Sequence, residues 1–125
     1  MEAPPAEPHL HLIDTKPYTI DSPLWNSRAK ALIVNWIPHC IAKISDPNLR
    51  EGGINNLVDA AHKLAGKPHG RHRGYVFSNA WIYNTIESIC VALMVDPQGD
   101  QEIINAQQAM KATLEDWIPK VLAAQ

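Results

Sequence analysis

The stretch SNAWIYNTIESICVAL, residues 78–93, decides the fold class of this chain. Apolar side chains return in it every three or four positions, as they do along one face of an α-helix. From Ile89 onward the stretch is apolar on every side, which is typical of a helix enclosed by other helices. Ser78, at its start, is a residue type that commonly caps helix N-termini. The residues expected on the buried face are Trp81, Ile82, Thr85, Ile86, Ile89 and Leu93.

Further helices are predicted on both sides of that stretch. The sequence DSP at residues 21–23 places a capping side chain before a proline at the first helical position. Pro38 lies inside the helix that follows and should kink or divide it, because proline lacks the backbone N–H that a helix needs. A second helix is expected over residues 54–64, and Asp100 is expected to cap a last helix that Pro119 interrupts near its end. The last helix carries one apolar stripe, formed by Ile103, Met110, Leu114, Trp117 and Val121.

The chain divides into an arm and a helical part. Residues 1–20 are polar and rich in proline, so we expect an extended arm that is disordered over residues 1–8 and whose last part, from Tyr18 to Ile20, lies along the body. Residues 21–125 are expected to form the helices. The tripeptide WIP occurs at residues 36–38 and again at 117–119, which fits either a repeated helix pair or coincidence. No strand signal of comparable strength is present.

Composition excludes several classes of protein. The 125 residues carry a net charge of −2 and 19% charged residues, which argues against a nucleic-acid partner. The longest apolar run, Ile89 to Val95, has seven residues and is too short to cross a membrane. The N-terminus lacks the basic and apolar regions of a signal peptide, and the compartment stays unassigned. Cys40 and Cys90 form no CxxC motif and are both expected to be small buried residues.

Few residues are candidates for metal binding or catalysis. His9 and His11 form an HxH pair with no third ligand nearby, so no metal site is predicted. Glu87 could be a buried acid with a raised pKa, but a place on the polar stripe of its helix is favoured. A single carboxyl group is not the pair that most glycosidases use. No catalytic residue is therefore assigned within the chain.

The densest polar cluster lies in the loop between the second and third helices. Lys67, Arg71 and Arg73 stand within seven residues of one another, together with His69 and His72. Arginine suits a bidentate grip on a carboxylate or a phosphate. A solvated basic loop without a ligand is the more common arrangement and is the favoured interpretation.

Several segments resemble one known family. They read YTIDSPLW at 18–25, GGINNL at 52–57, GYVFSNAWIYNTIE at 74–87, DP at 96–97 and AAQ at 123–125. In their order and spacing they are similar to the N-terminal part of the beta-L-arabinofuranosidase family, glycoside hydrolase family 127 and its relatives. The resemblance covers nearly all of the chain after the arm.

The resemblance implies an (α/α)6 barrel of six helical hairpins, of which this chain would supply the first hairpins. It also implies retaining hydrolysis of L-arabinofuranosides or related furanose sugars in plant polysaccharides. In the family a zinc-bound cysteine is the nucleophile and a glutamate is the acid/base, and both lie downstream of anything matched here. No catalytic role or cofactor is therefore carried onto Cys40, Cys90 or Glu87. The implied partners are a carbohydrate substrate and the rest of the barrel, or a second copy that associates through exposed apolar helix faces.

One departure from the family affects the substrate. Many members carry Asp-Ser-Asp where this chain has NAW at residues 79–81. Asn79 and Trp81 are candidate sugar contacts, the first through its amide and the second by stacking, although an ordinary core position is favoured for Trp81. With His69, Arg71 and Arg73 nearby in sequence, we expect an acidic or otherwise modified sugar. The rival hypothesis is a non-catalytic all-α binding or scaffold module.

Overall fold

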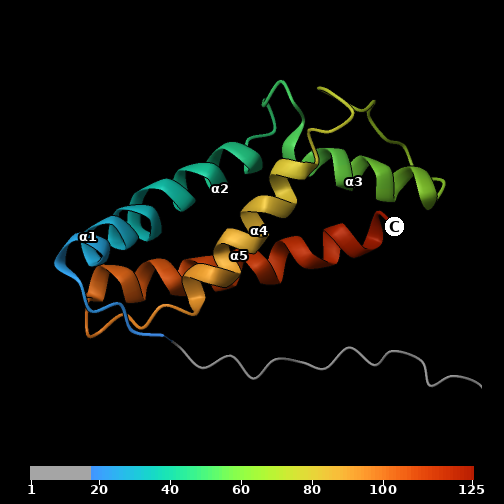
Figure 1. The fold of residues 1–125 in the computed structure, drawn as a ribbon. Helices are drawn as coiled ribbons and strands as arrows, with labels where there is room; N and C mark the ends of the chain where they lie inside the picture. Colours follow the sequence, from blue (N-terminus) through green and yellow to red (C-terminus); the bar gives the residue numbers. More distant parts are fainter. Residues whose placement is uncertain (1–17) are drawn as a thin grey trace, which may run out of the picture.

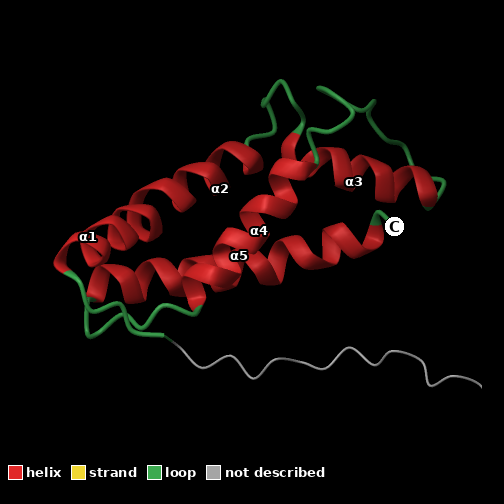
Figure 2. Cartoon of the chain, viewed as in Figure 1, coloured by secondary structure: helices red, strands yellow, loops and turns green. Residues whose placement is uncertain are grey.

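The computed structural model describes residues 18–125, and every described element is a helix (Figures 1 and 2). The predicted all-α class is confirmed for this range, in which one isolated bridge pairs Tyr18 with Val95. The start of the arm and the His9–His11 pair lie outside the described residues. The elements in chain order are α1 (Pro23–Ala31), the π-helical turn η1 (Leu32–Trp36), α2 (Ile37–Ser45), α3 (Gly53–Leu64), α4 (Ala80–Leu93) and α5 (Gln101–Ala123).

The first three elements form one continuous helical rod, although Pro38 was expected to kink or divide it. The turn before Pro38 widens into η1, and the N–H of Ile37 bonds to the carbonyl of Leu32, five residues back. A π-helical turn makes room for the proline ring, which would otherwise clash with the carbonyl four residues earlier. The rod therefore begins at the predicted cap, where the Ser22 side chain accepts from the N–H of Trp25, and continues to Ser45.

The helices pack as two long elements with a third laid across them. In Figure 1 the rod and α5 run in the same general direction, and α4 crosses in front of them in the opposite direction and packs against α5. The shorter α3 packs on the C-terminal half of α5. The glycine at the start of α3 permits its close approach to α2, since a Cβ on Gly53 would lie 2.2 Å from the carbonyl oxygen of Ile44.

Two adjoining apolar clusters make the core. One joins the rod, α4 and the first half of α5, and it consists of Ile33, Ile37, Ile89, Ala92, Val95, Ile103 and Met110. The other joins α2, α3, the start of α4 and the end of α5, and it consists of Ile44, Ile54, Leu57, Ile82 and Trp117. The half-buried Ile41 packs against both clusters and connects them.

The last helix follows its prediction except at Pro119. Asp100 caps α5, and its carboxylate accepts from the N–H groups of Glu102 and Ile103. The predicted stripe is confirmed, with Met110 and Trp117 almost completely buried. Pro119 does not interrupt the helix, which continues to Ala123.

The predicted buried face of α4 is partly wrong. The buried positions are Ile82, Thr85, Ile89 and Ala92. Trp81 is 44% exposed, because one residue along a helix is a rotation of about 100° away from the line through Ile82. The second half of α4 is not enclosed on all sides, since Val91 is 48% exposed.

Other local expectations also need correction. Ser78 is not the N-cap of α4, because its hydroxyl donates to the carbonyl of Tyr75 in the preceding turn and Asn79 takes the cap position. Cys90 is exposed and Cys40 is half-buried, so the expectation of two buried thiols is wrong for Cys90. Glu87 lies on the exposed side of α4, as favoured.

The repeated WIP tripeptide has no structural counterpart. Trp36 is 60% exposed while Trp117 is 2% exposed, and the two isoleucines are reversed, with Ile37 at 8% and Ile118 at 42%. The two tripeptides therefore turn opposite sides to the core, which favours coincidence.

The segment from Tyr18 to Ile20 lies along the body, as predicted. The N–H of Tyr18 donates to the carbonyl of Met94, and the carbonyl of Tyr18 accepts from the N–H of Asp96. The side chain of Gln98 donates to the carbonyl of Ile20 at 3.1 Å. These bonds hold the segment against the turn between α4 and α5.

Candidate functional site

The loop between α3 and α4 is fixed in place by one buried side chain. The amide nitrogen of Asn56 donates to the carbonyls of Glu51 and Arg73, at 3.1 and 2.9 Å. Its amide oxygen accepts from the N–H of Arg73 at 3.0 Å. Asn56 is 5% exposed, and these three bonds satisfy the polar atoms of its buried amide. They also connect the loop, through Arg73, to Glu51 in the turn before α3.

A second contact positions the tip of the loop. The Asp59 carboxylate on α3 accepts from the N–H of Gly70 at 2.8 Å. His69 Nδ1 lies 2.8 Å from the carbonyl of Gly70, and His72 Nε2 lies 3.1 Å from that of Tyr75. Because a carbonyl only accepts, the ring nitrogen that faces it is the donor in each case.

These contacts enclose a hollow of about 380 Å³, here called the loop pocket. It is lined by Asn56, Asp59, Ala60, Lys63, His69, Gly70, Arg71, His72 and Asn79. Three of the predicted site residues, His69, Arg71 and Asn79, therefore meet there. Asp59 and Lys63 were missed by the sequence analysis, and their spacing of four residues on the expected second helix was the available signal.

The polar groups of the loop pocket are only partly used. Asn79 Oδ1 is buried without a hydrogen-bond partner among the described residues. Within residues 18–125 the side chain of Arg71 makes no ion pair or hydrogen bond. The pocket thus offers the donors Lys63 and Arg71 beside the acceptors Asp59 and Asn79. Donors and acceptors that lie side by side in this way are suited to binding a polar ligand.

Arg73 is not part of this pocket. Its guanidinium donates to the carbonyl of Pro47 at 2.9 Å, and its backbone is held by Asn56 at both polar atoms. The side chain is half-buried against the turn between α2 and α3. Arg73 therefore has a structural role, because its contacts hold the loop against the turn between α2 and α3.

Trp81 also lies elsewhere, in a hollow between α2 and α4. That hollow is lined by Trp36, His39, Cys40, Lys43, Ile44, Leu49, Trp81, Asn84, Thr85 and Ser88. The rings of Trp36 and His39 stack there, with centroids 5.8 Å apart. Trp36 is 60% exposed there. Asn79 and Trp81 therefore belong to two different surfaces.

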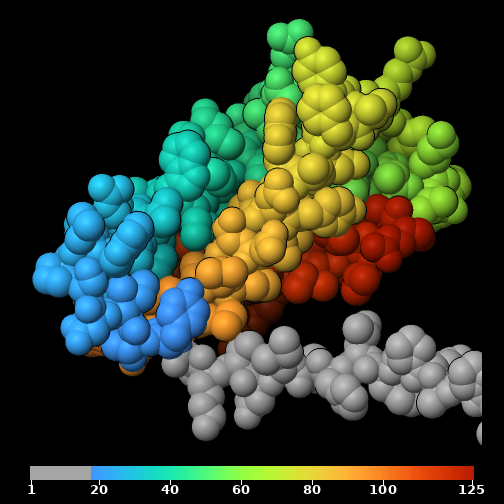
Figure 3. Space-filling view, in the orientation of Figure 1, coloured from blue at the N-terminus to red at the C-terminus, as the bar shows by residue number. Residues whose placement is uncertain are grey.

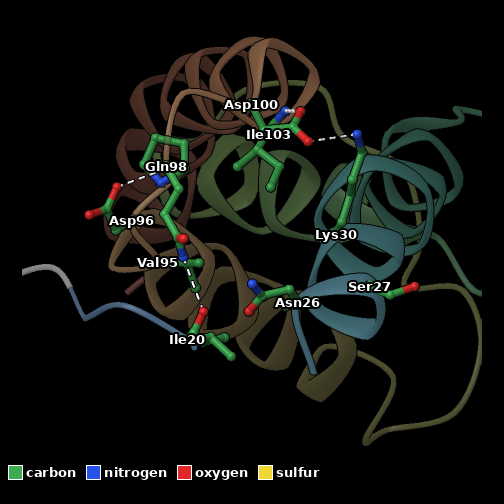
Figure 4. A pocket seen from close by; sticks show the side chains of 11 residues that line it. Ile20, Asn26, Ser27, Lys30, Val95, Asp96, Gln98, Asp100 and Ile103 are labelled. Atoms are coloured by element: carbon green, nitrogen blue, oxygen red, sulfur yellow. Dashed lines mark hydrogen bonds and ion pairs between the residues drawn. The ribbon is translucent and has the colours of Figure 1, made fainter. Parts of the chain in front are cut away.

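A third hollow, of about 290 Å³, lies where α1 meets the turn before α5 (Figure 4). Lys30 points across it to the carboxylates of Asp100, at 2.7 Å, and Glu102, at 2.5 Å. The hydrogen bond to Asp100, and then that to Glu102, raises the pKa of Lys30. The hydrogen bond from Lys30 lowers the pKa of Asp100. These groups join α1 to the capped start of α5, which is a structural role.

Among residues 18–125 no three histidine, cysteine, aspartate or glutamate side chains are grouped as a metal ion would need. None of the helices in that range combines the length and apolar character required to cross a membrane. No family model matches the chain, and neither the curated proteins nor the solved structures include a match.

Proposed function

We propose that this chain is the N-terminal helical part of a retaining glycoside hydrolase that acts on L-arabinofuranosides or related furanose sugars of plant polysaccharides. The resemblance of residues 18–125 to the beta-L-arabinofuranosidase family motivates the proposal. The loop pocket is the single observation that carries it, because it collects His69, Arg71 and Asn79 at the start of α4. The nucleophile, the acid/base and any zinc ligands would lie outside this chain.

The chemistry of the loop pocket supports a sugar ligand. Each sugar hydroxyl both donates and accepts, so a sugar site needs donors and acceptors side by side. Asn79 Oδ1 and the Asp59 carboxylate supply acceptors, while Lys63 and Arg71 supply donors. A bound hydroxyl would give Asn79 Oδ1 the partner that it lacks among the described residues.

The same pocket also supports a narrower proposal, in which the substrate is an acidic sugar. Arg71 is exposed and unengaged within the described residues, and Lys63 lies in the same lining. Asp59 is the one carboxylate there, and one of its oxygens already accepts from Gly70. A carboxylated furanoside could therefore pair with Arg71.

The exposed apolar residues favour a partial barrel over the rival, a self-contained binding or scaffold module. Leu64 is 66% exposed on α3, and Ile118 and Leu122 are 42% and 62% exposed on α5. Further helices of the proposed barrel would cover such side chains.

The test is an assay of the protein encoded by the complete reading frame on arabinofuranosides and carboxylated furanosides. Asn79→Ala should lower kcat/KM by about 10- to 100-fold, the usual loss for one hydrogen bond to a substrate. Asn105→Ala, at an exposed position on α5, is the matched control and should leave kcat/KM unchanged. Absence of furanoside hydrolysis by the complete protein would overturn the proposal.

The variant Arg71→Gln distinguishes a preference for acidic sugars from furanoside hydrolysis in general. It should lower kcat/KM for a carboxylated furanoside by about tenfold or more and leave a neutral furanoside unaffected. An equal effect on both substrates would contradict the proposal of an acidic sugar, but it would leave the proposal of a glycoside hydrolase standing. Hydrolysis by the isolated 125-residue chain would contradict the assignment of catalysis to residues outside it.

A further inference from the structure

Two aromatic side chains project to solvent from the segment that leads into α4. Tyr75 and Phe77 are 68% and 60% exposed, and neither belongs to the two core clusters. Their rings lie parallel, with an angle of 2° between the planes and 5.3 Å between the centroids. In Figure 3 this segment, in yellow, projects beyond the start of α4. We call these two side chains the ring pair.

The backbone that carries the ring pair is held in a fixed turn. The carbonyl of Tyr75 accepts from the N–H of Ser78 at 3.0 Å, from the Ser78 hydroxyl at 2.7 Å and from His72 Nε2 at 3.1 Å. Gly74 lies so close to the turn before α3 that a Cβ on it would be 2.8 Å from the Cα of Glu51. The backbone therefore has little freedom to turn the two rings toward the core.

The ring pair adjoins the loop pocket. His72 lines that pocket, and its ring contacts the carbonyl of Tyr75 three positions later. Asn79 lines the pocket as well, two positions after Phe77. A ligand larger than the loop pocket would therefore extend toward the ring pair. Further helices packed directly on the rings would crowd the same pocket, which argues against a packing surface of the barrel at this position.

Flat aromatic faces favour a particular kind of ligand. An aromatic ring is electron-rich on its faces and attracts the slightly positive hydrogens of C–H groups. A sugar ring presents C–H groups on one face and hydroxyls around its edge, so it can stack on an aromatic ring while its hydroxyls stay hydrated. The hydroxyl of Tyr75 adds one donor and one acceptor for such a ligand. Nucleic-acid bases also stack on aromatic side chains, but the net charge of −2 disfavours them.

We propose that the ring pair binds the sugar unit next to the furanose in the polysaccharide, on the other side of the bond that is cleaved. This inference rests on the proposed function, in which the loop pocket holds the furanose itself. Tyr75 and Phe77 then determine specificity for the length of the substrate, because a substrate with a single sugar leaves the rings uncovered.

The test compares a methyl furanoside with a disaccharide of the same furanose, using the protein encoded by the complete reading frame. Tyr75→Ala and Phe77→Ala should each lower the ratio of the two kcat/KM values, disaccharide over methyl furanoside, by about fivefold to tenfold. Tyr75→Phe keeps the aromatic ring and should retain most of the ratio. Val76→Ala is the matched control, because Val76 is 91% exposed between the two in sequence and carries no ring.

Urea unfolding of the same variants separates sugar binding from packing. Each ring variant should keep the midpoint of the wild type, since neither ring lies in the core. A lower midpoint would show that the rings pack against further helices, and it would overturn the proposal. A kcat/KM ratio that neither ring variant changes would overturn it as well.

A binding measurement distinguishes failure of this inference from failure of the proposed function. An arabinofuranose oligosaccharide added to the 125-residue chain should shift the amide NMR signals of residues 74–79, and Phe77→Ala should abolish those shifts. If the complete protein hydrolyses no furanoside but the shifts occur, the hydrolase is wrong and the ring pair remains a sugar-binding surface. If it hydrolyses furanosides while the shifts are absent and the ratio is unchanged, the ring pair alone is refuted. Absence of both hydrolysis and shifts refutes both.

Discussion

Replacing Asn56 by alanine should destabilise the protein by about 2–3 kcal/mol. The change removes three hydrogen bonds, one to Glu51 and two to Arg73, from a side chain that is 5% exposed. Each bond is worth about 1 kcal/mol. The better helix propensity of alanine offsets about 0.5 kcal/mol of that loss, because Asn56 lies inside α3.

Urea unfolding followed by circular dichroism measures the effect, with Asn105→Ala on α5 as the control. Asn105 is exposed and accepts one hydrogen bond, from Gln101, so its replacement should change stability by less than about 0.5 kcal/mol. Hydrogen exchange gives a local check, since the N–H of Arg73 donates to Asn56 and should lose protection in Asn56→Ala. A loss of stability no larger than that of the control would refute the role assigned to Asn56.

Two further predictions concern the backbone and the ion pair. Gly53→Ala should cost about 2 kcal/mol or more in urea unfolding, because Gly53 has φ 49° and a Cβ there would lie 2.2 Å from a carbonyl oxygen. Gly66→Ala, with φ 66° and open space around it, should cost only about 1 kcal/mol, and equal losses would contradict the steric argument. The stability advantage of the wild type over Lys30→Met should be constant between about pH 5 and 9. Because Lys30 lowers the pKa of Asp100, that advantage should shrink as pH falls below the ordinary value of 3.8; because Asp100 raises the pKa of Lys30, it should also shrink above 10.5. A difference that does not change over the whole range would disprove the linkage.

The ends of the helices were predictable because their signals are local. Ser22 and Asp100 accept from N–H groups two or three residues away, so the capping residue and its neighbours suffice to place each start. The stripe on α5 was predictable for the same reason, since its period follows from helix geometry. Pro38 was placed correctly as a disturbance, but the π-helical turn that accommodates it depends on the whole rod staying packed.

The candidate site was predictable only in part. Sequence proximity suggested one site for His69, Arg71, Arg73, Asn79 and Trp81. The fold divides them, because Asn56 draws the backbone of Arg73 toward α3 and the turn of α4 directs Trp81 to another surface. These contacts join residues 17 or more positions apart, and local spacing does not specify them.

The sequence by itself determined the helical class, the helix starts and the central line of apolar residues on α5. Only the tertiary structure decided which apolar residues the core would cover. Trp36 and Trp117 occur in the same tripeptide, yet the first is 60% exposed and the second 2%. The physical reason is that periodicity marks which residues share a helix face, while burial depends on where neighbouring helices lie. Here α2, α3 and α4 cover Trp117, whereas Trp36 lies on a side of the rod that the described helices leave uncovered.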